Sequence, residues 1–237
     1  DNNPSSYYLN ETLLPERDKG EINTGIEWWN FKTKPRQSWR YDPGTRRVRQ
    51  SPGYGFDMSF PGSGGSITVD EVRLFNGTGE RYQWKIVGKR EMYIPYNAYR
   101  LHSPNVKYAD LLKTGHVNPE HMRYELHRVW VLEGKLKDGF RHPFGKRVMF
   151  IDEDTWHAVA GDYYDTRGQL WQHAVINYYY AFDMNAWHAG TSFYHDLNSG
   201  SYVAYNLFQE RPKAPILGKD NLKPSQYTPE AIRNLGN

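Results

Sequence analysis

The clearest pattern in the sequence is an alternation of apolar and polar side chains over residues 123–137. Apolar residues occupy most even positions of this segment: Tyr124, Leu126, Trp130, Leu132 and Leu136. The odd positions are mostly charged, with Val129 and Val131 as the exceptions. A period of two residues predicts a β-strand, and the apolar side chains predict that its even face is buried and its odd face lies in water.

Further β-strands are predicted on both sides of this segment. They cover residues 82–94, 146–151, 156–164, 169–180, 192–197 and 201–208, with two more strands between residues 27 and 50. The turns at Asp42, Asp165 and Asp196 each have a Gly two to four residues later. Because Asp bonds the backbone of a turn and Gly accepts a positive φ, each turn predicts a hairpin. Consecutive hairpins predict a mainly β protein built as an antiparallel meander.

The two ends of the chain differ from this pattern. Residues 1–26 are polar and rich in turn-forming residues, which predicts an irregular N-terminal arm. Residues 27–237 are then predicted to form a single antiparallel β-sheet domain. Its tail is predicted to be a short helix, with Thr228 as the N-cap, Pro229 as the first helical residue and Gly236 as the stop.

Composition narrows the class of protein. The chain carries 30 Lys and Arg against 27 Asp and Glu, a net charge of +3 that predicts no nucleic-acid partner. Its 8 Trp, 10 Phe and 19 Tyr predict a packed core. The lack of cysteine excludes disulfides, thiol nucleophiles and iron–sulfur clusters. No apolar run approaches the roughly 18 to 20 residues that span a bilayer, so the chain is not expected to cross a membrane.

The spacing of polar residues indicates no catalytic or metal centre. The nine histidines show no recognised ligand spacing. Residues Asp152, Glu153 and Asp154 lack the spacing of a calcium loop and are interpreted as a solvated turn. Glu125 and Glu133 lie eight residues apart on one strand, about 26 Å at 3.3 Å per residue, which is too far for a catalytic carboxylate pair. The sequence therefore predicts no catalytic residue, no metal and no cofactor.

The abundant aromatic residues leave two interpretations open. Trp130, Trp156 and Trp171 fall on three successive predicted strands. They fit either a stacked core or the wall of a large apolar hollow, and the pattern alone does not separate the two.

Three long segments carry a resemblance to a known family. They are residues 93–101 (YIPYNAYRL), 123–131 (RYELHRVWV) and 145–156 (GKRVMFIDEDTW), and residues 39–44 (WRYDPG) fit the same family. From about residue 28 onward the chain resembles an uncharacterised family of exported Gram-negative proteins, similar to the outer-membrane lipoprotein-sorting LolA and LolB group. The resemblance implies a curved antiparallel half-barrel with a few short helices around an acyl-chain cavity. It also implies a location in the periplasm or at the periplasmic face of the outer membrane. Family members are longer and carry a signal peptide, so this chain is expected to be a C-terminal part whose signal has been removed.

Together these observations predict a non-catalytic cell-envelope protein that binds or carries a lipid, an acyl chain or a lipoprotein in a hydrophobic hollow. The predicted lining residues are Leu126, Trp130, Leu132, Trp171 and Ile176. The membrane export machinery is a further expected partner. The alternative is a carbohydrate-binding module or glycan-processing enzyme on an aromatic-rich β-scaffold, which an exposed row of Trp28, Trp39 or Tyr179 would favour.

Overall fold

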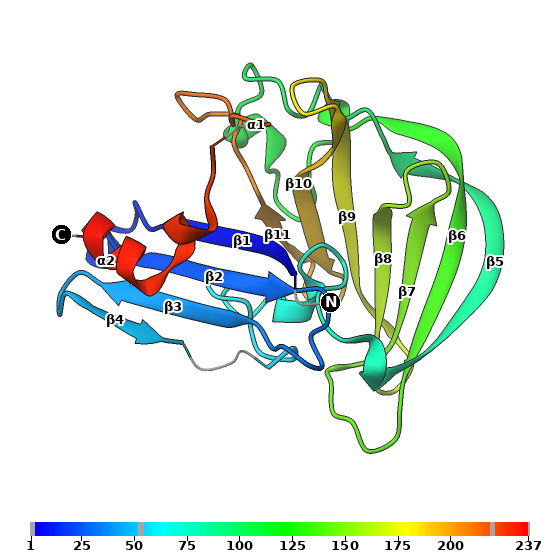
Figure 1. The fold of residues 1–237 in the computed structure, drawn as a ribbon. Helices are drawn as coiled ribbons and strands as arrows, with labels where there is room; N and C mark the ends of the chain where they lie inside the picture. The colour runs from blue at the N-terminus through cyan, green and yellow to red at the C-terminus, as the bar shows by residue number, and fades with distance from the viewer. Residues whose placement is uncertain (1–2, 52–54, 219–220, 237) are drawn as a thin grey trace. The chain divides into compact units, whose positions relative to one another are not determined.

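The computed structural model describes residues 3–51, 55–218 and 221–236 (Figure 1). The chain divides into two compact units: a first unit of residues 1–55 and 219–237, and a second unit of residues 56–218. The sequence instead predicted an arm followed by one sheet domain over residues 27–237. The division differs because the tail and the first strands pack together across a long separation in sequence.

The first unit is a four-stranded antiparallel sheet in the order β1-β2-β3-β4. Its elements are β1 (Pro4–Glu11), η1 (Glu16–Asp18), β2 (Ile22–Trp28), β3 (Gln37–Asp42), β4 (Arg47–Gln50), η5 (Pro224–Tyr227) and α2 (Pro229–Gly236). Helix α2 begins at Pro229 as predicted, and its Ile232 packs in a small core with Ile22 and Tyr41.

The prediction of an irregular arm over residues 1–26 is wrong, because β1 and most of β2 lie there. Strand β1 is an edge strand with no fully buried side chain. An edge strand tolerates polar residues and a proline at its start, so it leaves little hydrophobic alternation in the sequence.

The second unit is a seven-stranded antiparallel sheet in the order β11-β10-β9-β8-β7-β6-β5. Its strands are β5 (Tyr82–Pro95), β6 (Tyr124–Leu136), β7 (Phe144–Asp152), β8 (Ala158–Asp165), β9 (Leu170–Ala181), β10 (Ala186–Asp196) and β11 (Ser201–Tyr205). The short helices are η2 (Val69–Glu71), η3 (Gly79–Arg81), α1 (Tyr108–Leu111) and η4 (Pro119–His121). Each strand pairs with its neighbour in sequence, and the sheet curves without closing (Figure 1). The predicted curved meander is confirmed.

Strand register shows which side chains share a face of this sheet. Trp130 pairs with Ile151, Leu132 with Met149, and Gly134 with Arg147. We call this side of the sheet the Trp130 face. The opposite side, the Val129 face, carries Val129 paired with Asp152 and Val131 paired with Phe150.

The burial of β6 is opposite to the sequence prediction. Val129 is 0% exposed and belongs to the main core, whereas Leu126 is 56% exposed and Trp130 and Leu132 are only partly buried. The same core contains Ala98, Leu101, Val106 and Leu111 from the segment between β5 and β6. Alternation identified the strand, but the loops that cover a face decide which side is buried.

Candidate functional site

One end of the Trp130 face is covered by residues 56–76, which we call the covering segment. Three side chains of neighbouring strands bind it. Arg147 Nη2 lies 2.7 Å from Asp70 Oδ2, the Tyr163 hydroxyl donates to the Leu74 carbonyl at 2.9 Å, and Gln172 Nε2 donates to the Ser66 carbonyl at 3.1 Å. Arg147, Tyr163 and Gln172 are cross-strand partners on β7, β8 and β9, so they form one row under this segment.

The centre of this covered end is a buried ion pair. The Arg147 guanidinium is fully buried, 4.7 Å from the centroid of the Tyr82 ring and 5.5 Å from that of Phe144. His142 Nε2 lies 3.2 Å from Asp70. Burial alone would raise the pKa of Asp70, but the hydrogen bond from His142 and the charge of Arg147 hold that pKa below its usual value. Paired in this way, the charges tolerate burial.

The other end of the Trp130 face is open. On β5 and β6, Tyr93 pairs with Leu126, Lys89 with Trp130, and Ile86 with Leu132. Tyr93 is 68% exposed and Ile86 is 64% exposed. We call these six residues the open strip. The charged pair of Glu91 and Arg128 separates Tyr93 and Leu126 from the rest of the strip. Exposed apolar side chains gathered on one face mark surfaces that bind a partner or a ligand.

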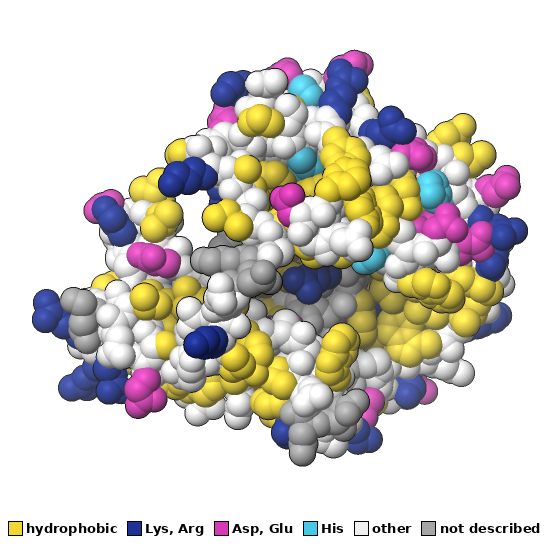
Figure 2. All heavy atoms as spheres, turned by 45° about the horizontal axis from the view of Figure 1, so that its top comes forward, with side chains coloured by type: hydrophobic (Ala, Val, Ile, Leu, Met, Phe, Trp, Pro, Cys, Tyr) yellow, Lys and Arg dark blue, Asp and Glu magenta, His cyan; other side chains and the backbone are white. Residues whose placement is uncertain are grey.

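The open strip has a charged and aromatic rim at the turn between β7 and β8. Trp156 in this turn is exposed, and its ring stacks on Trp130 with centroids 6.5 Å apart. Lys89 Nζ lies 4.3 Å from the Trp130 ring centroid and 2.5 Å from Glu153, which also binds Arg128. These bonds from Lys89 and then Arg128 lower the pKa of Glu153. Figure 2 shows apolar side chains in yellow with charged ones beside them over the seven-stranded sheet.

The structure brings together three of the five predicted lining residues. Leu126, Trp130 and Leu132 share the open strip. Ile176 lies on the same face by register, but it is 1% exposed and belongs to the core. Trp171 is partly buried, packs 5.5 Å from Phe144, and donates from Nε1 to Asp196.

The sequence analysis missed Ile86 and Tyr93, and it grouped Trp156 with Trp130 without placing Trp156 among the lining residues. Strand β5 has a register shift between Ile86 and Gly88, where the Gly88 φ is 149°. This bulge moves the side chains that follow it to the opposite face, so a simple alternation does not run through β5. A glycine within a strand is the signal that could have revealed it.

A second cluster lies on the Val129 face, at the rim close to the same turn. His127 Nδ1 is 3.0 Å from Asp152 Oδ1 and 3.6 Å from Asp154 Oδ2. The Tyr96 ring lies 4.1 Å from the His127 ring. Burial, together with the charges of Asp152, Asp154 and Glu125, raises the pKa of Tyr96 to about 12. Asp152 is fully buried, so the prediction of a wholly solvated acidic turn is wrong.

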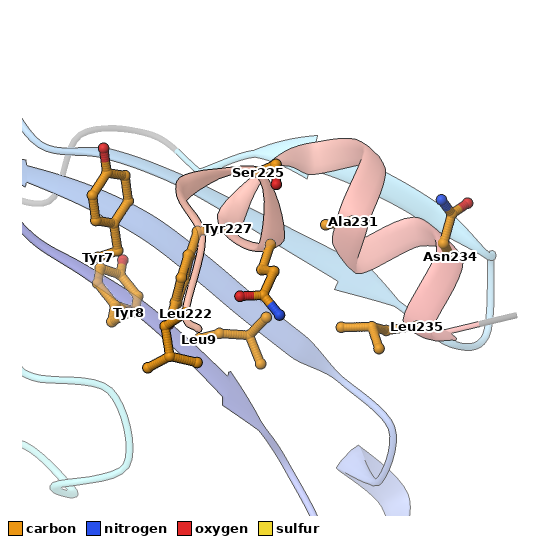
Figure 3. A pocket seen from close by; sticks show the side chains of 10 residues that line it. Tyr7, Tyr8, Leu9, Leu222, Ser225, Tyr227, Ala231, Asn234 and Leu235 are labelled. Carbon is orange, nitrogen blue, oxygen red and sulfur yellow. The ribbon is translucent and has the colours of Figure 1, made fainter. Parts of the chain in front are cut away.

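The first unit has an apolar pocket of its own, of about 750 Å³ (Figure 3). Tyr7 and Leu9 of β1, Leu222 and Tyr227, and Leu235 of α2 line it. None of the predicted lining residues lies there.

Comparison with known proteins identifies the family. A model for a protein family of unknown function, DUF1329, matches residues 1–233. The chain belongs to the DUF1329 family. An uncharacterized protein of Pseudomonas aeruginosa is 40% identical over 239 residues, which cover 99% of this DUF1329 chain and 52% of that protein. The chain therefore spans about half the length of this curated relative.

Solved structures agree on the fold. A domain from Vibrio parahaemolyticus named for outer membrane lipoprotein sorting aligns with a TM-score of 0.55 and 14% identity, over 95% of this chain and 76% of that one. A DUF1329 protein from Desulfovibrio piger aligns with a TM-score of 0.52 and 16% identity, over 84% of this chain and 67% of that one. The family resemblance and the fold predicted from the sequence are thus confirmed. Among the residues described, no helix has the length and apolarity needed to cross a bilayer.

Proposed function

We propose that this DUF1329 chain is a non-catalytic protein of the periplasm that binds the acyl chains of a lipid or lipoprotein on the open strip. The observation that carries the proposal is the exposure of Tyr93 beside Leu126, and of Ile86 further along the same strands, on a sheet face that is covered elsewhere. Each acyl CH₂ group that such a surface buries contributes about 0.8 kcal/mol.

The fold supports this proposal. The Vibrio parahaemolyticus domain with the same fold is named for lipoprotein sorting. Among the predicted lining residues, Leu126, Trp130 and Leu132 contact the acyl chain in this proposal, while Trp171 and Ile176 pack in or against the core. An interaction with the membrane export machinery stays a prediction from the resemblance.

No observation favours carbohydrate binding. Trp28, Trp39 and Tyr179 are all partly buried and do not stand out as exposed rings. In the open strip, the exposed Ile86 and Leu126 are aliphatic and offer no flat ring for a sugar to stack on, and the exposed rings are Tyr93 and, at the rim, Trp156.

Titration of the whole chain with a fluorescent fatty acid tests the proposal, together with mass spectrometry of lipid that copurifies. We expect saturable binding, which Leu126→Asp weakens at least tenfold because it places a charge in the acyl contact. Ile216→Asp is the matched control, since Ile216 is 78% exposed and lies outside the strip. Leu222→Asp tests the pocket of the first unit in the same way. The proposal fails if the chain shows no saturable binding, or if Leu126→Asp binds as tightly as the unaltered chain.

A further inference from the structure

The second cluster collects donor atoms of the kind that hold a metal ion. His127 lies on β6, Asp152 ends β7, and Asp154 lies in the turn that follows. One ligand atom from each of these residues lies within 4.8 Å of the other two. A shared ion about 2.1 Å from each donor needs separations of about 3 to 4 Å. The distances of 3.0 and 3.6 Å from His127 Nδ1 to the two aspartates fall in this range. The two carboxylate oxygens lie within 4.8 Å of each other, and the exposed Asp154 side chain can move to bring them closer.

The charges at this cluster are unbalanced. Glu153, between the two aspartates in sequence, is paired with both Lys89 and Arg128. Within the described part of the chain, neither Asp152 nor Asp154 forms an ion pair with a lysine or an arginine. Asp152 is nevertheless fully buried. Buried carboxylates are ordinarily paired with a cation or bound to a metal. Among the described residues, His127 is the one ion-pair partner of either aspartate.

The surroundings hold the donors in place. Thr155 donates to Asp152 Oδ2 from its backbone NH at 3.0 Å and from its hydroxyl at 2.7 Å, which leaves Oδ1 turned to His127. The Tyr96 ring packs on the imidazole. Glu125 Oε2 lies 4.0 Å from His127 Nε2, on the side away from the aspartates. At 4.0 Å this carboxylate is beyond hydrogen-bond distance of Nε2, but it places a negative charge on that side of the ring.

We propose that His127 Nδ1, Asp152 Oδ1 and Asp154 Oδ2 form a binding site for a divalent transition-metal ion of the Zn²⁺ type. One imidazole nitrogen with two carboxylate oxygens suits Zn²⁺, whereas Ca²⁺ and Mg²⁺ prefer oxygen donors alone. The ion takes the position of the proton shared by Nδ1 and Asp152, and the neutral imidazole then carries its proton on Nε2, towards Glu125. Three protein donors leave one position for water or for a further ligand.

Calorimetric titration of the chelator-treated chain with Zn²⁺ tests this site, and the visible spectrum of the Co²⁺ form reports its ligands. We expect one ion per chain. Asp154→Asn weakens binding at least tenfold, and it leaves the fold intact because Asp154 is exposed. His127→Gln has the same effect and removes the nitrogen contribution from the Co²⁺ spectrum.

Two control variants make the result specific. Glu153→Gln changes the neighbouring carboxylate, and Asp110→Asn removes an exposed histidine–carboxylate pair in which His121 Nε2 lies 2.6 Å from Asp110. Both variants keep the affinity of the unaltered chain. The proposal is overturned if no ion binds at one per chain, or if Asp110→Asn rather than Asp154→Asn abolishes binding. Because lipid titration is a separate measurement, either result stands apart from the proposed acyl binding.

Discussion

The two ends of the Trp130 face present the same sheet surface in opposite ways. At the covered end, the covering segment seals Arg147 beneath it and pairs the guanidinium with Asp70. At the open end, Leu126 and Tyr93 are exposed, and no segment among the described residues buries them. The fold therefore buries a charge on the same face where it exposes hydrocarbon. Burial here follows the loops that cross the sheet and not the polarity of the strand residues.

The two ends of the Trp130 face also differ in role, since the covered end stabilises the fold and the open end is available to bind. A buried ion pair adds little stability over an apolar replacement, but loss of one partner strands the other charge in a dry site. The covered end is therefore sensitive to single substitutions. An exposed apolar strip contributes little to folding and is available to bind. The predictions below test this division.

Removal of the guanidinium at the covered end has the largest expected effect. Arg147→Leu leaves the Asp70 carboxylate buried without its cation, so the free energy of unfolding falls by about 3 to 5 kcal/mol. The double variant Arg147→Leu with Asp70→Asn recovers a large part of this loss, since no unpaired charge remains. Urea denaturation measures both. Arg128→Leu is the control, because Arg128 is exposed and its loss leaves the urea midpoint unchanged. Equal effects of the two arginine substitutions would show that the covered end is not a closed site.

The pH dependence of stability tests the same end through Glu71, which is fully buried in the covering segment. Burial raises the pKa of Glu71 from 4.5 to about 7, although hydrogen bonds from Thr68 oppose the shift. The folded chain therefore binds this proton more tightly than the unfolded chain. Protonated Glu71 therefore stabilises the folded state. This stabilisation, on the order of 3 kcal/mol, is complete below pH 4.5 and is lost as the pH rises through 7.

Glu71→Gln, which imitates the protonated acid, is expected to flatten this dependence. Its stability relative to the unaltered chain rises from pH 5 to pH 8 in urea denaturation. Glu120→Gln, an exposed acid on η4, is the control and leaves the profile unchanged. If the stability of Glu71→Gln varies with pH in the same way as that of the unaltered chain, Glu71 is hydrated and the covering segment admits water.

The sequence was sufficient for the existence and order of the strands of the second unit, although β10 begins at Ala186 and not at the predicted residue 192. Period-two alternation over residues 123–137 and the Asp and Gly turns predict hairpins, and hairpins join strands that are neighbours in the chain. The same reasoning was insufficient for β1, whose polar residues lie at a sheet edge. It also failed for the buried face of β6, because residues 98–111, which share a core with Val129, carry no signal of where they pack.

The candidate site was predictable in part for similar reasons. Leu126, Trp130 and Leu132 were recognisable as one face of a strand, whatever covered it. Tyr93 joins them through the bulge at Gly88, and Trp156 joins through a turn, so neither follows from alternation. The cluster of His127 with Asp152 and Asp154 arises from cross-strand register between β6 and β7, which spacing along the sequence does not show.

The smallest expected effect comes from paired substitutions within β6. Val129→Ala removes a fully buried side chain from the core and is expected to lower the free energy of unfolding by roughly 2 kcal/mol. Leu126→Ala removes a larger side chain, but one that is mostly in solvent, and is expected to change stability by under about 0.5 kcal/mol. Hydrophobicity alone predicts the reverse order, so the pair tests which face of β6 is packed. If Leu126→Ala is the more destabilising change in urea denaturation, the open strip is part of the core and is not available to a ligand. If Leu126→Ala hardly changes the free energy of unfolding while Val129→Ala lowers it, the open end of the Trp130 face is unpacked surface. A weaker fatty-acid affinity of Leu126→Ala then reports a lost contact and not a damaged fold.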